Sequence, residues 1–367
     1  MKTIWSEISL GGITLKNRFM HSAVSENCCS ERGEVTDRLL ACYECTGENG
    51  ELGLVVTGLT YVNRQGQKWP HQMGAWDDSL IPGLAQLAAI LQKHGTKAFV
   101  QLATAGVYAD PSLTGFEAVG PSSIDSFSAT PGNRGMTQDE IHALAQDFGE
   151  AARRVREAGF SGVELHGAHG YGLSQFLSPL FNKRADEYGG SPENRARIVV
   201  DILHSIKEKA GRDFPVMIKM NGSDFAEGGT VEQEALCMAK LMEKAGLDAV
   251  ECSGGMNFNP SPFTRPSQRV HPRTRENEAY FKEIARTFTL GLNIPVAQVG
   301  GIRTLETAEK LIEEGCCALV SLARPLIRAP DLVQRWKHGN HEPSDCLSCN
   351  RCLEHSRTVG GVACAIR

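Results

Sequence analysis

Eight short apolar runs, each followed by a helical pattern, constrain the fold of this 367-residue chain more than any other feature. The runs are rich in β-branched residues, and the segments between them repeat apolar residues with the period of a helix. Strand–helix repeats build a parallel sheet that is either open or closed into a barrel. The expected strands are RFMHSAV (18–24), GLVVTG (53–58), KAFVQL (97–102), GVELHG (162–167), PVMIKM (215–220), DAVECS (248–253), PVAQVG (295–300) and ALVSLA (318–323).

The clearest of the expected helices covers residues 137–159. Thr137 fits its N-cap, Glu140 three residues later completes a capping box, and Gly159 ends the pattern. The other expected helices are 81–93, 193–210, 231–245, 304–314 and 330–338.

An open doubly wound sheet would normally carry G-x-G-x-x-G after its first strand, and the chain contains no such sequence. We therefore expect an α/β fold of the (β/α)8 TIM-barrel type. ISLGGITLK (8–16) predicts an N-terminal hairpin that closes the barrel bottom. Residues 103–136, rich in Gly, Pro and Ser, predict a capping excursion after the third strand. The expected domains are the barrel (1–338) and a Cys-rich C-terminal extension (339–367).

The charge pattern disfavours two classes of partner. The formal net charge is −5 and no run of five or more basic residues occurs, which argues against nucleic acid and anionic membranes. The N-terminus lacks the apolar core of a signal peptide, and no stretch approaches the roughly 18 apolar residues of a transmembrane helix. We expect a cytoplasmic protein, in which the twelve cysteines are not paired as disulfides.

Polar residues at the carboxyl ends of the strands define the expected site, because barrel enzymes carry their working residues there. The set is neutral to basic, and the strand acids Glu164 and Glu251 could both point outward. His166 and His169 follow the fourth strand. They could bind a divalent metal, although such sites normally include carboxylates. Alternatively, both could donate hydrogen bonds to one carbonyl or nitro oxygen while Tyr171 delivers a proton.

A phosphate site is expected where the barrel closes. Gly300 and Gly301 follow the seventh strand, where backbone N–H groups can approach an anion, and Arg324 follows the eighth strand. Lys219 and Gln101 lie at the ends of other strands, further into the barrel. Together these residues predict a phosphorylated planar cofactor across the barrel mouth.

Several long motifs occur in the order typical of one family. They are LKNRF (15–19), HGAHGYGLSQFLSPLFNKRADEYGGSPENRARI (166–198), SDFAEGG (223–229) and LARPLIRAPDLVQRW (322–336). With them the chain resembles, over essentially its whole length, the Old Yellow Enzyme family of FMN-dependent ene reductases (NADH:flavin oxidoreductases). The resemblance implies a barrel that binds FMN and takes hydride from NAD(P)H.

The resemblance also implies roles for individual residues. His166 and His169 match the pair that holds the oxygen of the substrate's electron-withdrawing group, and Tyr171 matches the tyrosine that protonates the neighbouring carbon. Lys219 matches the basic residue near the pyrimidine end of the flavin. The remaining matches contact the flavin or its phosphate: Ser22, Ala23, Val24, Ser25, Leu59, Gln101, Gly300, Gly301, Ala323 and Arg324.

The reaction implied by the resemblance is ping-pong. Hydride passes from NAD(P)H to FMN, and then from the flavin to the β carbon of an activated alkene of the enone, enoate or nitro type. The implied partner is therefore a small molecule. A homo-oligomer is one option for the assembly, and the sequence does not choose between NADH and NADPH.

The chain departs from the family pattern at the third strand. The usual motif is Q-L-x-H-x-G-R, whereas QLATAGV (101–107) has Thr104 and Val107 in place of the histidine and arginine. This departure affects the expected substrate scope rather than flavin binding. Leu59 also replaces a residue that is usually small or polar.

Four cysteines near the C-terminus, Cys346, Cys349, Cys352 and Cys364, have the spacing C-x2-C-x2-C-x11-C. Four thiolates suit zinc or an iron–sulfur cluster. The tail is similar to the cluster motif of the larger 2,4-dienoyl-CoA reductase branch, but it is one residue shorter between the second and third cysteines. The second redox module of those proteins does not occur in this sequence, so a cluster here would lose its relay role. The tail is therefore expected to bind a [4Fe-4S] cluster or zinc, or to be a structural staple or a relic.

Two other functions stay open. The chain could be a flavin and iron–sulfur module for electron transfer or redox sensing, or a barrel hydrolase with His166 and His169 as metal ligands. Neither alternative uses Tyr171.

Overall fold

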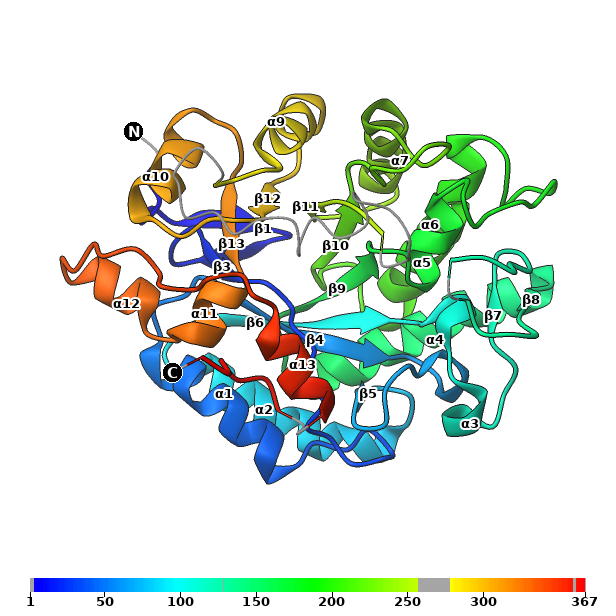
Figure 1. Cartoon of the computed structure of the whole chain (residues 1–367), viewed down its shortest axis with the longest axis horizontal. Coiled ribbons are helices and arrows are strands. Elements are labelled where there is room, and N and C mark those ends of the chain that lie inside the picture. Colours follow the sequence, from blue (N-terminus) through cyan, green and yellow to red (C-terminus); the bar gives the residue numbers. More distant parts are fainter. Residues whose placement is uncertain (1–2, 128, 257–277, 359–360, 367) are drawn as a thin grey trace.

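The computed structural model describes residues 3–127, 129–256, 278–358 and 361–366. Its centre is a closed barrel of eight parallel strands, as predicted (Figure 1). The barrel closes because β3 pairs with β13 on one side and with β4 on the other. The strands are β3 (Phe19–His21), β4 (Leu54–Tyr61), β6 (Lys97–Ala103), β9 (Gly162–Gly167), β10 (Val216–Asn221), β11 (Ala249–Ser253), β12 (Val296–Val299) and β13 (Leu319–Leu322).

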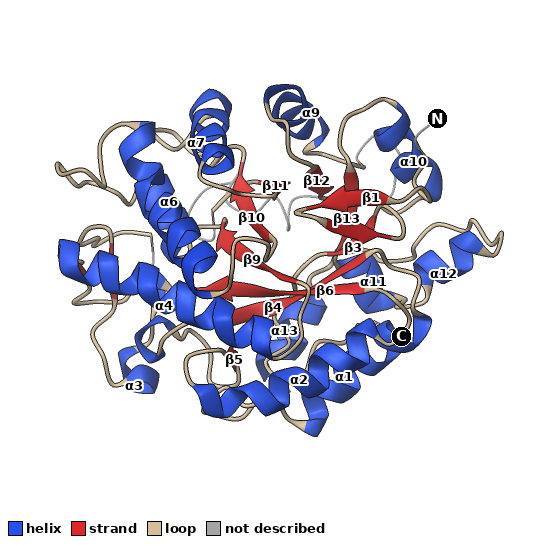
Figure 2. Cartoon of the chain, turned by 180° about the vertical axis from the view of Figure 1, so that it is seen from behind, coloured by secondary structure: helices blue, strands red, loops and turns tan. Residues whose placement is uncertain are grey.

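Helices surround the barrel (Figure 2). In the helix predicted over 137–159, Thr137 Oγ1 accepts from the Glu140 N–H at 3.2 Å, and Glu140 Oε2 accepts from the Thr137 N–H at 2.8 Å, which confirms the capping box. The main helices are α1 (Asp37–Asn49), α2 (Ile81–Gln92), α4 (Gln138–Glu157), α6 (Pro192–Lys209), α7 (Glu232–Lys244), α9 (Lys282–Gly291), α10 (Leu305–Glu313), α11 (Arg324–Arg328) and α12 (Leu332–Lys337).

The N-terminal hairpin is confirmed. Strands β1 (Ile8–Leu10) and β2 (Ile13–Leu15) pair antiparallel. Leu10 and Leu15 are fully buried and belong to one apolar cluster with barrel residues such as Phe99 and Met217. The hairpin therefore fills one end of the barrel interior and leaves the carboxyl ends of the strands for the site.

The excursion after β6 contains short ordered elements. It includes α3 (Pro111–Thr114) and a two-stranded pair of β7 (Val119–Gly120) with β8 (Arg134–Gly135). The buried Asn133 side chain braces it, because its amide donates to the Ile124 carbonyl at 2.7 Å and its oxygen accepts from the Ile124 N–H at 2.9 Å. The excursion lies next to α5 (Gly172–Leu177), which follows the predicted site motif.

The C-terminal extension folds back against the barrel (Figure 1). Arg303 after β12 donates to the Cys346 carbonyl at 2.8 Å, and its own carbonyl accepts from the Ser344 N–H at 2.8 Å. The extension then forms α13 (Arg351–Thr358). The division into domains 1–338 and 339–367 stays a prediction, and the extension lies in direct contact with the barrel.

Candidate active site

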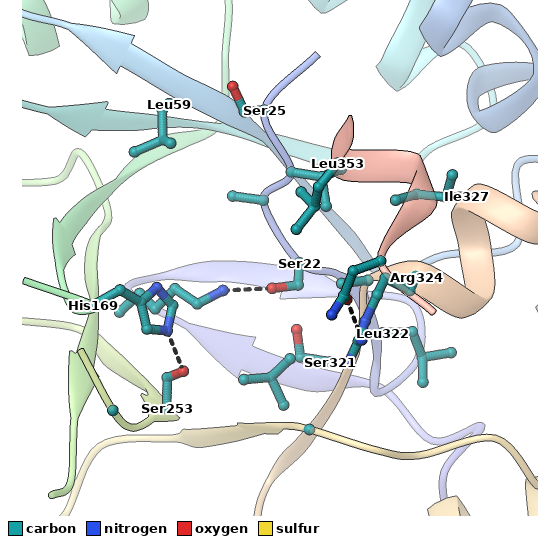
Figure 3. Close-up of a pocket in the computed structure, with 18 of the residues that line it drawn as sticks. Ser22, Ser25, Leu59, His169, Ser253, Ser321, Leu322, Arg324, Ile327 and Leu353 are labelled. Carbon is teal, nitrogen blue, oxygen red and sulfur yellow. Dashed lines mark hydrogen bonds between the residues drawn. The ribbon is translucent and has the colours of Figure 1, made fainter. Parts of the chain in front are cut away.

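A cavity of about 500 Å³ opens at the carboxyl ends of the barrel strands (Figure 3). Its volume lies in the range of small-molecule and cofactor pockets. Most of the residues predicted for the site line it: Ser22, Ala23, Val24, Ser25, Leu59, His169, Tyr171, Lys219, Gly300, Gly301, Ala323 and Arg324. The predicted residues His166 and Gln101 lie behind this lining and are almost fully buried.

The motif after β9 brings three aromatic rings together. The His166 ring centroid lies 5.5 Å from that of His169 and 5.6 Å from that of Tyr171. His169 has φ +63°, a left-handed conformation that costs free energy in a non-glycine residue. Two contacts hold it there: its N–H donates to Asn221 Oδ1 at 3.2 Å, and its Nε2 is hydrogen-bonded to Ser253 Oγ at 2.7 Å (Figure 3).

Both imidazoles are neutral at ordinary pH. Burial, with the nearby His169 and Lys219, holds the pKa of His166 well below its usual value. Burial and the charge of Lys219 lower the pKa of His169 to about 3. Neither ring nitrogen of His166 has a hydrogen-bond partner among the described residues, although both are buried. Since buried polar atoms are normally paired, His166 fits a site that receives a polar group from a bound molecule.

Below the cavity, the barrel interior holds a buried ion pair. Lys219 Nζ lies 3.2 Å from Glu251 Oε2 and donates to Ser22 Oγ at 2.6 Å. Ser22 and Ser321 donate to Glu251 Oε1 at 2.8 and 2.7 Å. Burial alone would raise the pKa of Glu251, but the charge of Lys219 and the hydrogen bonds lower it below its usual value. Glu251 is therefore a carboxylate.

Glu164 is a second buried acid in the same layer. Gln101 Nε2 donates to Glu164 Oε2 at 2.6 Å. Burial and the charge of Glu251 raise the pKa of Glu164 well above its usual value, so this acid is neutral. The sequence left open that both acids point outward, but each is fully buried inside the barrel and lies two residues before an inward-facing residue, His166 or Ser253. That two-residue period was the signal that the sequence analysis missed.

The loop after β12 has the form of an anion cradle. Gly300 and Gly301 have φ +118° and +76°. A Cβ on Gly300 would lie 2.7 Å from the Tyr280 ring, and one on Gly301 would lie 2.8 Å from it, so both positions require glycine. Arg324, at the start of α11, points its side chain toward the cavity, where its Nη1 donates to Asn350 Oδ1 at 2.7 Å (Figure 3). Glycine backbone, Arg324 and Lys219 together fit a cofactor that carries a phosphate.

The C-terminal extension contributes to the same cavity, which the sequence analysis did not predict. Leu353, Ser356 and Arg357 of α13 lie in its lining. Asn27, just after the predicted Ser22–Ser25 segment, also lines it and donates to the Ser356 carbonyl at 3.5 Å. The extension meets residues more than 300 positions away, and spacing along the chain gives no signal for such a contact.

The four tail cysteines line a second cavity, of about 220 Å³, next to the first. Arg324 and Asn350 belong to the lining of both cavities. Within the described part of the chain, no group of three or more His, Cys, Asp or Glu side chains is arranged to hold a metal ion.

The two residues that depart from the family motif are buried beside the site. Thr104 accepts, through its carbonyl, from the Gly172 N–H at 2.9 Å, and Val107 donates, through its N–H, to Gln175 Oε1 at 3.0 Å. Val107 belongs to an apolar cluster with Tyr108, Phe181 and Met256, against which Tyr171 packs. Tyr171 therefore packs against apolar side chains.

Among the helices that the structure describes, none is long and apolar enough to span a membrane.

The sequence was compared with family models and with known proteins, and both comparisons find flavin oxidoreductases and related reductases. The family model for the NADH:flavin oxidoreductase / NADH oxidase family covers residues 3–342. The chain is 35% identical to a NADH oxidase of Thermoanaerobacter brockii, over 95% of this chain and 52% of that protein. It is 34% identical to a metal reductase of Desulforamulus reducens, over 100% of this chain and 53% of that protein. It therefore spans about half the length of these two relatives. An NADPH dehydrogenase of Geobacillus sp. is 35% identical over 89% of this chain and 91% of its own length.

Solved structures of two reductases superpose on this chain. A 2-naphthoyl-CoA reductase, in complex with 2-naphthoyl-CoA, superposes with a TM-score of 0.90 at 28% identity, over 100% of this chain and 57% of that chain. Morphinone reductase, at 22% identity with a TM-score of 0.78 over 95% of this chain and 94% of that chain, shares the fold. The chain belongs to the NADH:flavin oxidoreductase / NADH oxidase family, the Old Yellow Enzyme family of NAD(P)H-dependent flavin oxidoreductases.

Proposed function

We propose that this chain reduces a C=C bond conjugated to a carbonyl or nitro group, with NAD(P)H as reductant, FMN as cofactor and a ping-pong order. FMN, when bound, supplies the hydride chemistry by accepting two electrons from NAD(P)H and donating two to the alkene. The observation that carries the proposal is that His169 and Tyr171 open into the cavity that also contains Lys219, the glycine cradle and Arg324.

The residues proposed to bind FMN fall into groups according to the part of the cofactor that each would contact. Gly300, Gly301 and Arg324 would bind the phosphate, with Ala323 beside them. Lys219 would place positive charge at the pyrimidine end of the flavin. The flavin ring itself would contact Ser22, Ala23, Val24, Ser25 and Leu59. Gln101 does not line the cavity, and it would influence the cofactor site only through its hydrogen bond to Glu164.

His166 and His169 would hold the oxygen of the electron-withdrawing group. Because both rings are neutral, each has one N–H to donate and titrates outside the range of ordinary pH. Donors fixed in a dry site stabilise the negative charge that develops on that oxygen during hydride addition. Tyr171 would then give its phenol proton to the α carbon.

An anaerobic assay with NADPH and 2-cyclohexenone tests the proposal. We expect cyclohexanone as the product, with one NADPH consumed for each alkene reduced. The His166→Ala/His169→Ala variant should retain FMN, judged by its absorption spectrum, and lose at least about 10²-fold in rate, as removal of an oxyanion donor does. Full activity in this variant would exclude the histidine pair from the reaction.

We also propose that Cys346, Cys349, Cys352 and Cys364 bind an iron–sulfur cluster or zinc. A cluster would make electron transfer a second function, whereas zinc would be structural. All four thiols line one cavity, and thiolates are the ligands of such clusters and of zinc. Within the described residues no three of these thiols are arranged to hold a metal ion, so binding would have to draw them together. Iron, acid-labile sulfide and zinc analysis of the anaerobically purified protein tests the site. Stoichiometric iron and sulfide would support a cluster, zinc alone would support a structural staple, and absence of all three would exclude both.

A further inference from the structure

Two cysteines outside the tail face each other near the cofactor cavity. Cys28 lies in the segment between β3 and α1, and Cys42 lies on α1. Their sulfur atoms are 3.5 Å apart, within hydrogen-bonding distance. Cys45 lies three residues after Cys42 on α1, but the Cys42 sulfur lies against that of Cys28.

The two thiols have unlike surroundings. Cys28 is buried, with 4% of its surface exposed, whereas Cys42 is partly exposed. A hydrogen bond from Cys28, the Val362 N–H and the charge of Arg38 together lower the pKa of Cys42 to about 7, against the opposing effect of burial. The same hydrogen bond and burial raise the pKa of Cys28. At neutral pH, Cys42 therefore has thiolate character while Cys28 remains a thiol.

A partly exposed cysteine with thiolate character beside a buried thiol is the arrangement of a peroxide-reactive cysteine with its resolving partner. We propose that Cys28 and Cys42 form a dithiol site that reacts with hydroperoxides and closes into an intrachain disulfide. The Cys42 sulfur attacks the peroxide O–O bond, giving Cys42 sulfenic acid and, with hydrogen peroxide, hydroxide. The Cys28 thiol then attacks that sulfur, forms the S–S bond and releases water. The two thiols lose two electrons, and the peroxide is reduced to water.

The Cys28/Cys42 pair lies next to the wall of the cofactor cavity and next to the C-terminal extension. Asn27, adjacent to Cys28, lines the cofactor cavity. The Glu26 carbonyl accepts from the Gly361 N–H at 3.0 Å, and a Cβ on Gly361 would lie 3.3 Å from the Cys28 sulfur. A disulfide requires an S–S distance of about 2.05 Å, so closure must move a segment that contacts both regions.

Peptide mapping of the full-length chain tests the proposal. The reduced protein is treated with hydrogen peroxide, its remaining thiols are alkylated, and tryptic peptides are analysed without reduction. We expect loss of two thiols per chain and a cross-link between peptides 19–32 and 39–64, reversible by dithiothreitol. Oxidation of other cysteines while this pair stays reduced would overturn the proposal.

Four single variants assign the cross-link, because each peptide contains a second cysteine. Cys29→Ser and Cys45→Ser are matched controls on the same two peptides and should keep the cross-link. Cys42→Ser should abolish the cross-link. In Cys28→Ser the reaction should stop at the Cys42 sulfenic acid, which dimedone traps. A cross-link that persists in Cys28→Ser or Cys42→Ser would overturn the assignment. The map of the unsubstituted chain stands as a test even where a variant folds poorly.

Discussion

At the scale of single residues, the barrel interior below the cavity contains one buried cation, one buried anion and one neutral acid. Lys219, Glu251 and Glu164 are all almost fully buried, and they come from three neighbouring strands of the barrel. A buried charge is tolerated when it is paired and hydrogen-bonded. Lys219 and Glu251 compensate each other, so Glu164 has no partner cation and keeps its proton.

The Glu251→Gln variant should destabilise the protein by about 3–5 kcal/mol, because it leaves the Lys219 ammonium buried without its anion. Urea unfolding measures the loss. Adding Lys219→Met to Glu251→Gln should recover part of it, because the uncompensated charge is then removed. A Glu251→Gln variant as stable as the original would mean that the two side chains are not an ion pair.

Glu164→Gln should change how stability depends on pH. Because the folded-state pKa of Glu164 is raised, the folded chain keeps a proton that the unfolded chain loses above about pH 4.3, and stability falls as pH rises from there. Glutamine removes this slope, so the variant should gain stability relative to the original chain between pH 5 and pH 8. Urea unfolding at both pH values measures the gain, with the exposed Glu31→Gln as control. An equal response in both variants would contradict a neutral buried Glu164.

At the scale of elements, local patterns predicted most of the framework. All eight barrel strands, the hairpin and the α4 capping box were found where the sequence indicated them, because apolar runs and caps are local properties. Which face a polar strand residue takes depends on the register of the whole barrel. Glu164 and Glu251 were therefore misjudged, although their spacing from His166 and Ser253 contained the information.

The turn after β12 allows a test at this scale. Gly300→Ala should weaken FMN binding and destabilise the protein by about 1–3 kcal/mol, because alanine at φ +118° is strained and its Cβ meets the Tyr280 and Phe281 rings. Gly315→Ala is the matched control, since Gly315 also has positive φ, +65°, but has open space around its Cβ position. Flavin titration and urea unfolding give the two values. Equal losses of stability, with FMN affinity unchanged, would show that the turn is not a cradle.

At the scale of the whole molecule, the site joins segments from both ends of the chain. The segment after β3 and helix α13 meet at the cavity through Asn27 and Ser356, and Arg324 reaches Asn350 beside the tail cysteines. The family motifs predicted the residues of the barrel mouth, because each follows its own strand. The contribution of the extension depends on long-range contacts between segments without a shared motif, and sequence spacing alone could not predict it.

The central claim is that this cavity reduces an alkene with Tyr171 as the proton source, and rapid mixing of the Tyr171→Phe variant tests it most directly. The two half-reactions are followed anaerobically by flavin absorption, first with NADPH and then with 2-cyclohexenone. Reduction by NADPH should be retained, whereas reoxidation by the enone should slow by about 10²–10⁴-fold, the usual contribution of a general acid. Tyr108→Phe, whose ring centroid lies 6.0 Å from that of Tyr171, should change neither step. Reoxidation of Tyr171→Phe at the original rate would contradict the account.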